Sequence, residues 1–345
     1  MKGSELLRSA ARWIPGATLR PFGRPVALFF HGVTPRINDP RVEINHHTAE
    51  SFRAIATRLK RCFNVLPLSA LDDVLKRPER HARTVFLMAD DGYANTLETA
   101  APILEDLHLP WTLFVSTQHI ETGEWNPLIL ARLFLYFAPD GSYRIPHFPE
   151  PIRLGTAAER EKLALSLLPD LKKLPADFAR ESVTAFKNAF TPAQLDALKM
   201  RFPSERYLTW TEIERLHARG VEIGAHAHWH WPMNEYQSGN YLHAQARWAR
   251  QAIASHVGAC RYFAYPFGNV GDVSHAAIHA VRDAGYDYAF TTLSGTLHGS
   301  VNRWCLPRYA LRPEEPHLDS VLPMLRLGDK RVARFGIPNI SPATC

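Results

Sequence analysis

Two carboxylates stand side by side in the sequence, although like charges repel. Asp90 and Asp91 follow the apolar run TVFLMA and precede Gly92. A bound cation would neutralise one carboxylate and leave the other free to accept a proton. The pair therefore indicates acid–base chemistry beside a metal ion.

Three histidines crowd into the stretch GAHAHWHWP, which also follows an apolar run. If the chain stays extended, His226, His228 and His230 face one side; if it turns after His226, then His226 and His230 meet at i, i+4 spacing. Either geometry presents two imidazoles to one cation, although such a cluster alone is more often a polar strand end. One aspartate with two histidines supplies three ligands and leaves the fourth position of a tetrahedral zinc ion open to water.

The elements that must position these residues are short apolar runs alternating with stretches of helical period. The expected strands are 26–30, 84–89, 111–116, 221–225, 262–266 and 288–292. Strands that are apolar throughout and joined by helices predict a parallel sheet covered on both faces, open or closed into a barrel. Ligand sites gather at the C-terminal ends of such strands. The aspartates and the histidines both lie at such ends.

The chain is expected to form one domain, with a helical insertion over 126–206, where no strand-like run is found. Thr191 and Gln194 form a capping box, and Pro192 suits the first helical position. Because the insertion follows the third strand, we predict that it forms part of the substrate cleft. The expected parts are a basic leader over 1–24, the domain over 25–320 and a tail over 321–345.

Charge, cysteine spacing and hydropathy limit the partners and the location that can be expected. The formal charge is +6, yet the 40 basic residues are scattered among 34 acidic ones, so we expect no nucleic-acid partner and only a weak preference for anions. The four cysteines form no CxxC pattern and are expected to be reduced. No signal peptide or membrane span is predicted, which favours the cytoplasm. The leader could contact the inner membrane surface as a short amphipathic helix or pack on the domain; oligomeric state is not indicated.

Three motifs carry a resemblance to a known family. ADDG at 89–92, HAHWH at 226–230 and AYPFG at 264–268, in this order and each closing a strand, resemble the polysaccharide deacetylase family, carbohydrate esterase family four. The resemblance covers about residues 25–310. It implies a distorted (β/α) barrel of about seven mostly parallel strands, and metal-dependent removal of acetyl groups from N-acetylated sugars. Zinc is the implied ion, although cobalt, nickel or manganese suit the same ligands.

The resemblance also implies roles for single residues. Asp90 would be the catalytic base, and the metal ligands would be Asp91, His226 and His230. His228 has no ligand role in the motif and would line the pocket. A backbone N–H near Phe267 would help to hold the tetrahedral oxyanion. Aromatic side chains in or beside the motifs could present flat faces to sugar rings, namely Tyr93, Trp125, Trp229, Trp231 and Tyr265.

Two positions depart from the family pattern. The third motif often begins with an arginine that steadies the catalytic aspartate, but Ala264 stands there. Arg308 could supply the guanidinium from a neighbouring strand, or it could be a surface arginine. The late Leu-x-His motif is absent, whereas FFHGV at 29–33 fits members of permuted order, in which the acid histidine lies on the first strand. We therefore predict His31 as the general acid, kept charged by a carboxylate partner.

The leading hypothesis is a deacetylase of N-acetylhexosamine units in a polysaccharide, such as an exopolysaccharide, or in a glycolipid. A hydrolase of a non-carbohydrate amide or imide is the alternative among enzymes, because the metal set fixes the reaction and not the acyl donor. A carbohydrate-binding protein that has lost catalysis is the third, and Ala264 is its best support. Retention of both aspartates argues against the third, since binding alone needs no spare base.

Overall fold

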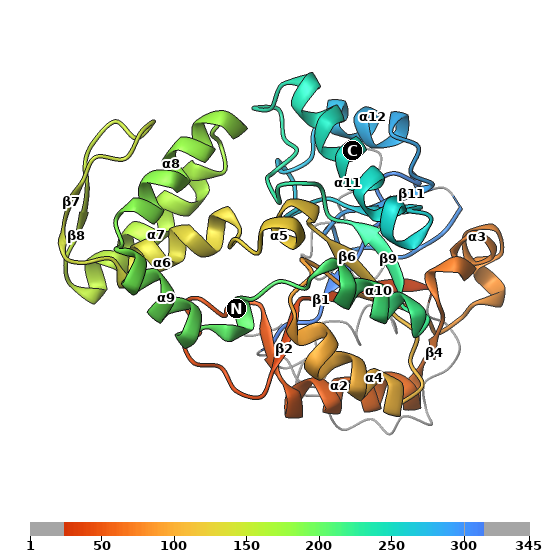
Figure 1. Ribbon diagram of the computed structural model, residues 1–345. Helices are drawn as coiled ribbons and strands as arrows, with labels where there is room; N and C mark the ends of the chain where they lie inside the picture. Colours follow the sequence, from red (N-terminus) through yellow and green to blue (C-terminus); the bar gives the residue numbers. More distant parts are fainter. Residues whose placement is uncertain (1–23, 300, 314–345) are drawn as a thin grey trace, which may run out of the picture.

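The computed structural model describes residues 24–299 and 301–313 (Figure 1). The predicted tail and nearly all of the predicted leader lie outside these residues. The central sheet consists of parallel strands, and β4 (Asn64–Val65) also pairs with β5. Its order is β11 (Tyr288–Phe290), β10 (Tyr262–Ala264), β9 (Glu222–Ala225), β6 (Thr112–Val115), β5 (Thr84–Ala89), β1 (Val26–Phe30) and β12 (Tyr309–Ala310). This curled sheet confirms the predicted fold class, a distorted (β/α) barrel.

Successive side chains of each strand enter two different cores, as the period of two requires. On β1, Leu28 packs in the larger cluster and Phe29 in the smaller, and Leu87 and Met88 on β5 divide in the same way. All residues of both strands are buried. The strands are therefore apolar throughout because both faces of the sheet are covered, as the sequence predicts.

Helices connect the strands and supply the outer layer (Figure 1). Several begin with a hydroxyl that accepts a backbone N–H in the first turn, as Thr48, Ser238 and Ser274 do. These helices are α2 (Ala49–Cys62), α3 (Leu71–Lys76), α4 (Ala101–Asp106), α5 (Thr117–Thr122), α10 (Trp210–Ala218), α11 (Gly239–Val257) and α12 (His275–Asp283). Within the described residues, no helix is both long and apolar enough to cross a membrane.

The insertion forms a separate group of elements beside the sheet, coloured yellow to green in Figure 1. The predicted capping box is present at the start of α9, with proline in its first turn. The expectation that the insertion contains no strand was wrong, because a short antiparallel hairpin lies between two of its helices. Its strands are too short to give an alternating pattern. The elements are α6 (Pro127–Phe137), β7 (Gly141–Tyr143), β8 (Ile152–Leu154), α7 (Ala157–Leu171), α8 (Ala176–Asn188) and α9 (Pro192–Arg201).

Further strand pairs escaped sequence analysis because they are only two or three residues long. Two of them matter for the site. β12 lies parallel to β1, with Leu28 opposite Tyr309, and so brings residue 308 to the sheet. The other is the parallel pair β2 (Gly32–Thr34) and β3 (His46–Thr48), which fixes the chain directly after His31.

Candidate active site

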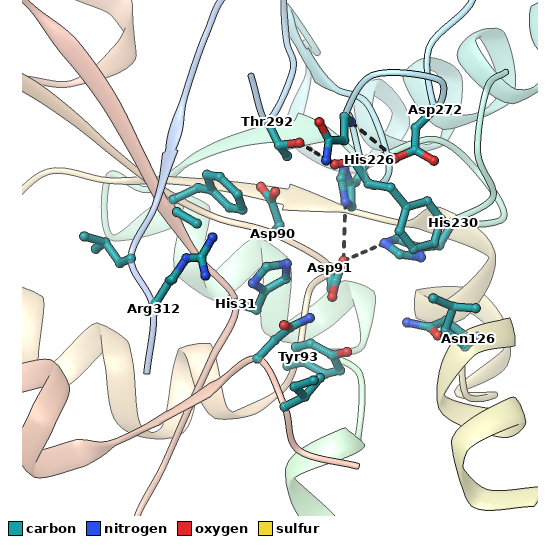
Figure 2. Close-up of a pocket in the computed structure, with 18 of the residues that line it drawn as sticks. His31, Asp90, Asp91, Tyr93, Asn126, His226, His230, Asp272, Thr292 and Arg312 are labelled. Atoms are coloured by element: carbon teal, nitrogen blue, oxygen red, sulfur yellow. Dashed lines mark hydrogen bonds and ion pairs between the residues drawn. The ribbon is translucent and has the colours of Figure 1, made fainter. Parts of the chain in front are cut away.

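The two aspartates face different partners because the backbone reverses between them. The N–H of Asp90 still donates to Phe30 O at 2.9 Å, which continues the ladder of β5. Asp91 and Gly92 then adopt left-handed conformations, with φ of 75° and 90°. A non-glycine residue seldom adopts such a φ, so the surrounding fold must hold it there. Figure 2 shows both carboxylates at the cavity, with Asp91 joined to two histidines.

The histidine stretch turns rather than staying extended. β9 ends at Ala225, and Ala227 and His230 have φ of 57° and 37°. The turn brings the rings of His226 and His230 to 4.9 Å between centroids. His228 points elsewhere: its Nδ1 lies 2.7 Å from Thr117 Oγ1, and its ring meets the edge of another aromatic side chain. The structure thus selects the i, i+4 alternative and leaves His228 outside the cavity.

Asp91, His226 and His230 converge as a set of three ligands. Asp91 Oδ1 lies 3.4 Å from His226 Nε2 and 2.9 Å from His230 Nε2. Ligand atoms about 2.1 Å from a tetrahedral ion lie about 3.4 Å apart, so the spacing fits a metal such as zinc. The other nitrogen of His226 lies 2.7 Å from Ala264 O, which orients the ring with Nε2 toward Asp91. The donor set is therefore suited to one divalent ion.

Arg308 is a buried partner of Asp90, not a surface residue. Its guanidinium donates to both carboxylate oxygens, at 2.8 and 2.9 Å, and its Nε donates to Thr291 O at 3.0 Å. Burial alone would raise the pKa of Asp90, but the charge of Arg308 and that of His226 outweigh it and hold the pKa below its usual value. The carboxylate therefore stays ionised and ready to accept a proton. Arg308, directly before β12, supplies the contact that Ala264 cannot make.

His31 and Phe267 both line the same cavity as the aspartates. Burial lowers the pKa of His31, and the negative charges of Asp91 and Asp90 only partly oppose this. We expected a carboxylate to raise the pKa of His31 and keep it charged. This expectation was wrong, because the loss of hydration on burial outweighs the attraction of the two carboxylates. Phe267 has φ of 62°, and its N–H has no acceptor among the described residues. That N–H is free to receive a ligand.

The aromatic side chains divide between cavity and core. Tyr93 lines the cavity beside the metal set. Trp125 borders a second cavity of about 450 Å³ beneath the insertion. Trp229 and Tyr265 are buried, the first under the guanidinium of Arg180 at 3.8 Å. Trp231 is buried as well, and none of these three side chains lines the main cavity, so they pack behind the motifs instead of facing the ligand.

The main cavity has a volume of about 540 Å³ and lies at the C-terminal ends of the strands (Figure 2). The insertion supplies part of its wall, as predicted from its place after the third strand. Sequence analysis did not select most of the polar lining, because asparagines and single cations give no spacing signal. The lining polar residues that it missed are Asn45, Asn126, Arg132, Lys172, Asn269, Asp272, Thr292 and Arg312.

Comparisons with known proteins agree with this architecture. A model of the polysaccharide deacetylase family matches residues 169–289. The deacetylase PplD from Streptococcus pyogenes, in complex with acetate, superposes with a TM-score of 0.57 and 13% identity, covering 88% of this chain and 99% of its own. IcaB from Ammonifex degensii superposes with a TM-score of 0.52 and 15% identity, and the match covers 86% of this chain and 96% of IcaB. A de-N-acetylase from Aggregatibacter actinomycetemcomitans superposes with a TM-score of 0.50 and 15% identity, and the match covers 90% of this chain and 99% of that enzyme.

At these identities the solved structures establish the fold alone, and no curated protein matches the chain. The fold and the site together define a class of protein. It is a distorted barrel of parallel strands that carries three candidate metal ligands at the C-terminal ends of the strands. The family model matches residues 169–289, a range that contains two of the three motifs, HAHWH and AYPFG, and so agrees with the resemblance to the polysaccharide deacetylases. A carbohydrate deacetylase is the activity that this match supports.

Proposed function

We propose that the protein is a metal-dependent deacetylase that hydrolyses the N-acetyl group of an N-acetylhexosamine unit in a polysaccharide or glycolipid. One observation carries the proposal. Of two adjacent aspartates, Asp91 faces two imidazoles at ligand spacing, while Asp90 is held ionised by Arg308 on the same cavity. A ligand carboxylate and a spare base are what amide hydrolysis at a metal requires.

In this proposal Asp91, His226 and His230 hold the ion. Zinc is the best fit to one oxygen and two nitrogens, and when bound it would supply Lewis-acid polarisation of the acyl oxygen and a lower pKa of water. Asp90 accepts the proton of the attacking water, whose oxygen forms the new bond to the acyl carbon. The free N–H of Phe267 donates to the oxyanion that develops there.

His31 donates a proton to the nitrogen as the carbon–nitrogen bond breaks, which yields acetate and a free amine. Its lowered pKa makes the imidazolium a stronger acid, although fewer molecules carry the proton as the pH rises. His31→Ala should keep bound metal and lose about two to four orders of magnitude in kcat. Near-normal turnover in that variant would transfer the role to another group.

The other readings are less well supported. The hypothesis of a carbohydrate-binding protein that has lost catalysis rested on the missing arginine at position 264. Arg308, however, makes the expected contact with Asp90. A non-carbohydrate amide remains the alternative substrate, since the metal set does not choose the acyl donor. Cytoplasmic location and contact of the leader with a membrane surface stay predictions.

Acetate release from N-acetylglucosamine oligomers is the experiment that tests the proposal. Activity should vanish with a chelator and return with zinc, cobalt, nickel or manganese, and the metal that restores most activity identifies the preferred ion. Arg308→Gln and the exposed Arg247→Gln serve as a site variant and its control. Activity that survives complete metal removal would contradict the proposal, and so would release of acetate only from simple amides.

A further inference from the structure

The candidate active-site cavity contains more cationic side chains than its acids can neutralise. Arg132, Lys172 and Arg312 all line it, together with the residues of the metal set. Arg132 lies on α6, one turn after Leu128, so both side chains share the helix face that borders the cavity. Arg312 follows β12, and Figure 2 shows it across the cavity from Asn126, which caps α6. The two arginines thus enter from opposite walls.

Each acidic residue of the cavity already has a partner. Asp90 is paired with Arg308, and Asp91 faces the two imidazoles. Asp272 Oδ1 forms an ion pair with Lys172 Nζ at 2.7 Å. Lys172 also lies 4.3 Å above the ring of Phe267, so its ammonium is fixed and its charge is compensated. Among the described residues that line this cavity, no carboxylate is therefore left to neutralise the two arginines.

Arg132 and Arg312 form no hydrogen bond or ion pair with any residue in the described part of the chain. Arg132 acts electrostatically on Glu205, a buried residue. Burial raises the pKa of Glu205 to about 8, and Arg132 only partly opposes this shift. The carboxyl is mostly protonated at neutral pH and leaves the charge of Arg132 uncompensated. An anion brought by the ligand would supply the missing charge.

A neutral glycan carries no negative charge that could compensate the two guanidinium groups. Guanidinium groups bind carboxylate and phosphate through paired N–H donors, and they do so best where water is partly excluded. We propose that the cavity binds an acidic N-acetylated glycan, in which a uronate carboxylate or a phosphate next to the acetylated sugar contacts Arg132 and Arg312. This inference rests on the proposed function and narrows its substrate.

Three glycans test the inference. They are the neutral tetramer of N-acetylglucosamine, a hyaluronan tetrasaccharide, which alternates N-acetylglucosamine with glucuronate, and an N-acetylglucosamine oligomer carrying a phosphate. At low ionic strength the zinc-loaded protein should deacetylate at least one acidic glycan with a kcat/KM about tenfold or more above that of the neutral tetramer. Added salt should reduce this preference, because it screens the contact. The acidic glycan with the higher kcat/KM shows whether the two arginines bind a uronate carboxylate or a phosphate.

Arg132→Gln and Arg312→Gln should each reduce the preference for the acidic glycan about tenfold, chiefly through KM. Arg247→Gln removes an exposed arginine of α11 that does not line the cavity, and it should keep the preference. Arg312 is exposed, so its variant tests the inference even if replacement of the half-buried Arg132 disturbs folding. Equal rates on all three glycans, or an unchanged preference in both variants, would overturn it.

Binding separates this inference from the proposed function. If no glycan is deacetylated, the proposed function fails, and calorimetry on Asp90→Asn protein decides the inference independently. That protein should bind the acidic glycan about tenfold more tightly than the neutral tetramer. Equal affinity for acidic and neutral glycans would overturn the inference, whatever the outcome of the activity assay.

Discussion

The adjacent aspartates have different partners, because the left-handed Asp91 turns one carboxylate toward the histidines and leaves the other on Arg308, and we propose that they have separate tasks. Asp90→Asn should therefore abolish turnover while zinc stays bound at close to one ion per chain. Asp91→Asn should lose both activity and metal, because one of three ligands becomes a weaker amide donor. Metal analysis of the two purified variants, beside an acetate assay, checks this. Equal metal loss in both would contradict the division of roles.

We propose that Arg308 sets the pH range in which Asp90 can act as a base. In Arg308→Gln the attraction is gone while burial remains, so the pKa of Asp90 should rise. The base must be deprotonated to work, so the acidic limb of kcat/KM should move to higher pH, and activity at pH 6 should fall about tenfold more than at pH 8. Arg308→Lys should restore part of the shift, since it keeps a charge but loses the paired geometry. Superimposable pH–rate profiles would disprove this role.

Sequence analysis selected the residues that converge on the cavity better than it selected the residues around them. Asp90, Asp91 and the histidines follow long apolar strands, and strand ends can be located from sequence. The partner of Asp90 stayed undecided, because Arg308 precedes a strand of only two residues. His228 shares a motif with His226 and His230, and only the turn at Ala227 decides that it points away. Backbone reversals of this kind leave no spacing signal.

The pair β2 and β3 positions His31 through a close backbone approach. Gly32 lies opposite His46, and a methyl group at Gly32 would overlap the His46 ring. Gly32→Ala should therefore displace His31 and lower kcat about tenfold or more, with metal retained. Gly239→Ala is the control, because nothing lies near its missing methyl group. Steady-state kinetics with metal analysis checks the prediction, and normal kcat in Gly32→Ala would show that the histidine does not depend on this contact.

The insertion shows which element-level features a sequence can carry. Its helices were predicted from their period and from the capping box at Thr191, and its place beside the cavity follows from its entry after β6. Its hairpin was missed, and so was the lining role of Arg132 and Lys172. Those side chains reach the cavity because of how α6 and α7 pack, which depends on contacts distant in sequence.

At the scale of the whole molecule, Glu205 lies where the insertion returns to the sheet domain. Its carboxylate is 3.6 Å from His46 Nδ1, and both side chains are buried. The charged groups that act on it also include Arg132, Glu43 and Asp91. Burial raises its pKa from 4.5 to about 8 in the folded chain. Folding therefore holds a proton on this group that the unfolded chain releases above pH 4.5.

This protonation predicts a pH-dependent stability. A carboxyl whose pKa is raised by folding contributes most at low pH, and its contribution falls as the pH rises from 4.5 through 8. Between pH 5 and pH 8 the free energy of unfolding should lose on the order of 3 kcal/mol through Glu205 alone. Glu205→Gln, which cannot ionise, should remove that part of the slope, whereas Glu214→Gln at a more exposed position should not. Denaturant unfolding from pH 5 to pH 8.5 measures the three slopes, and parallel curves for the wild type and Glu205→Gln would show that Glu205 ionises at an ordinary pH.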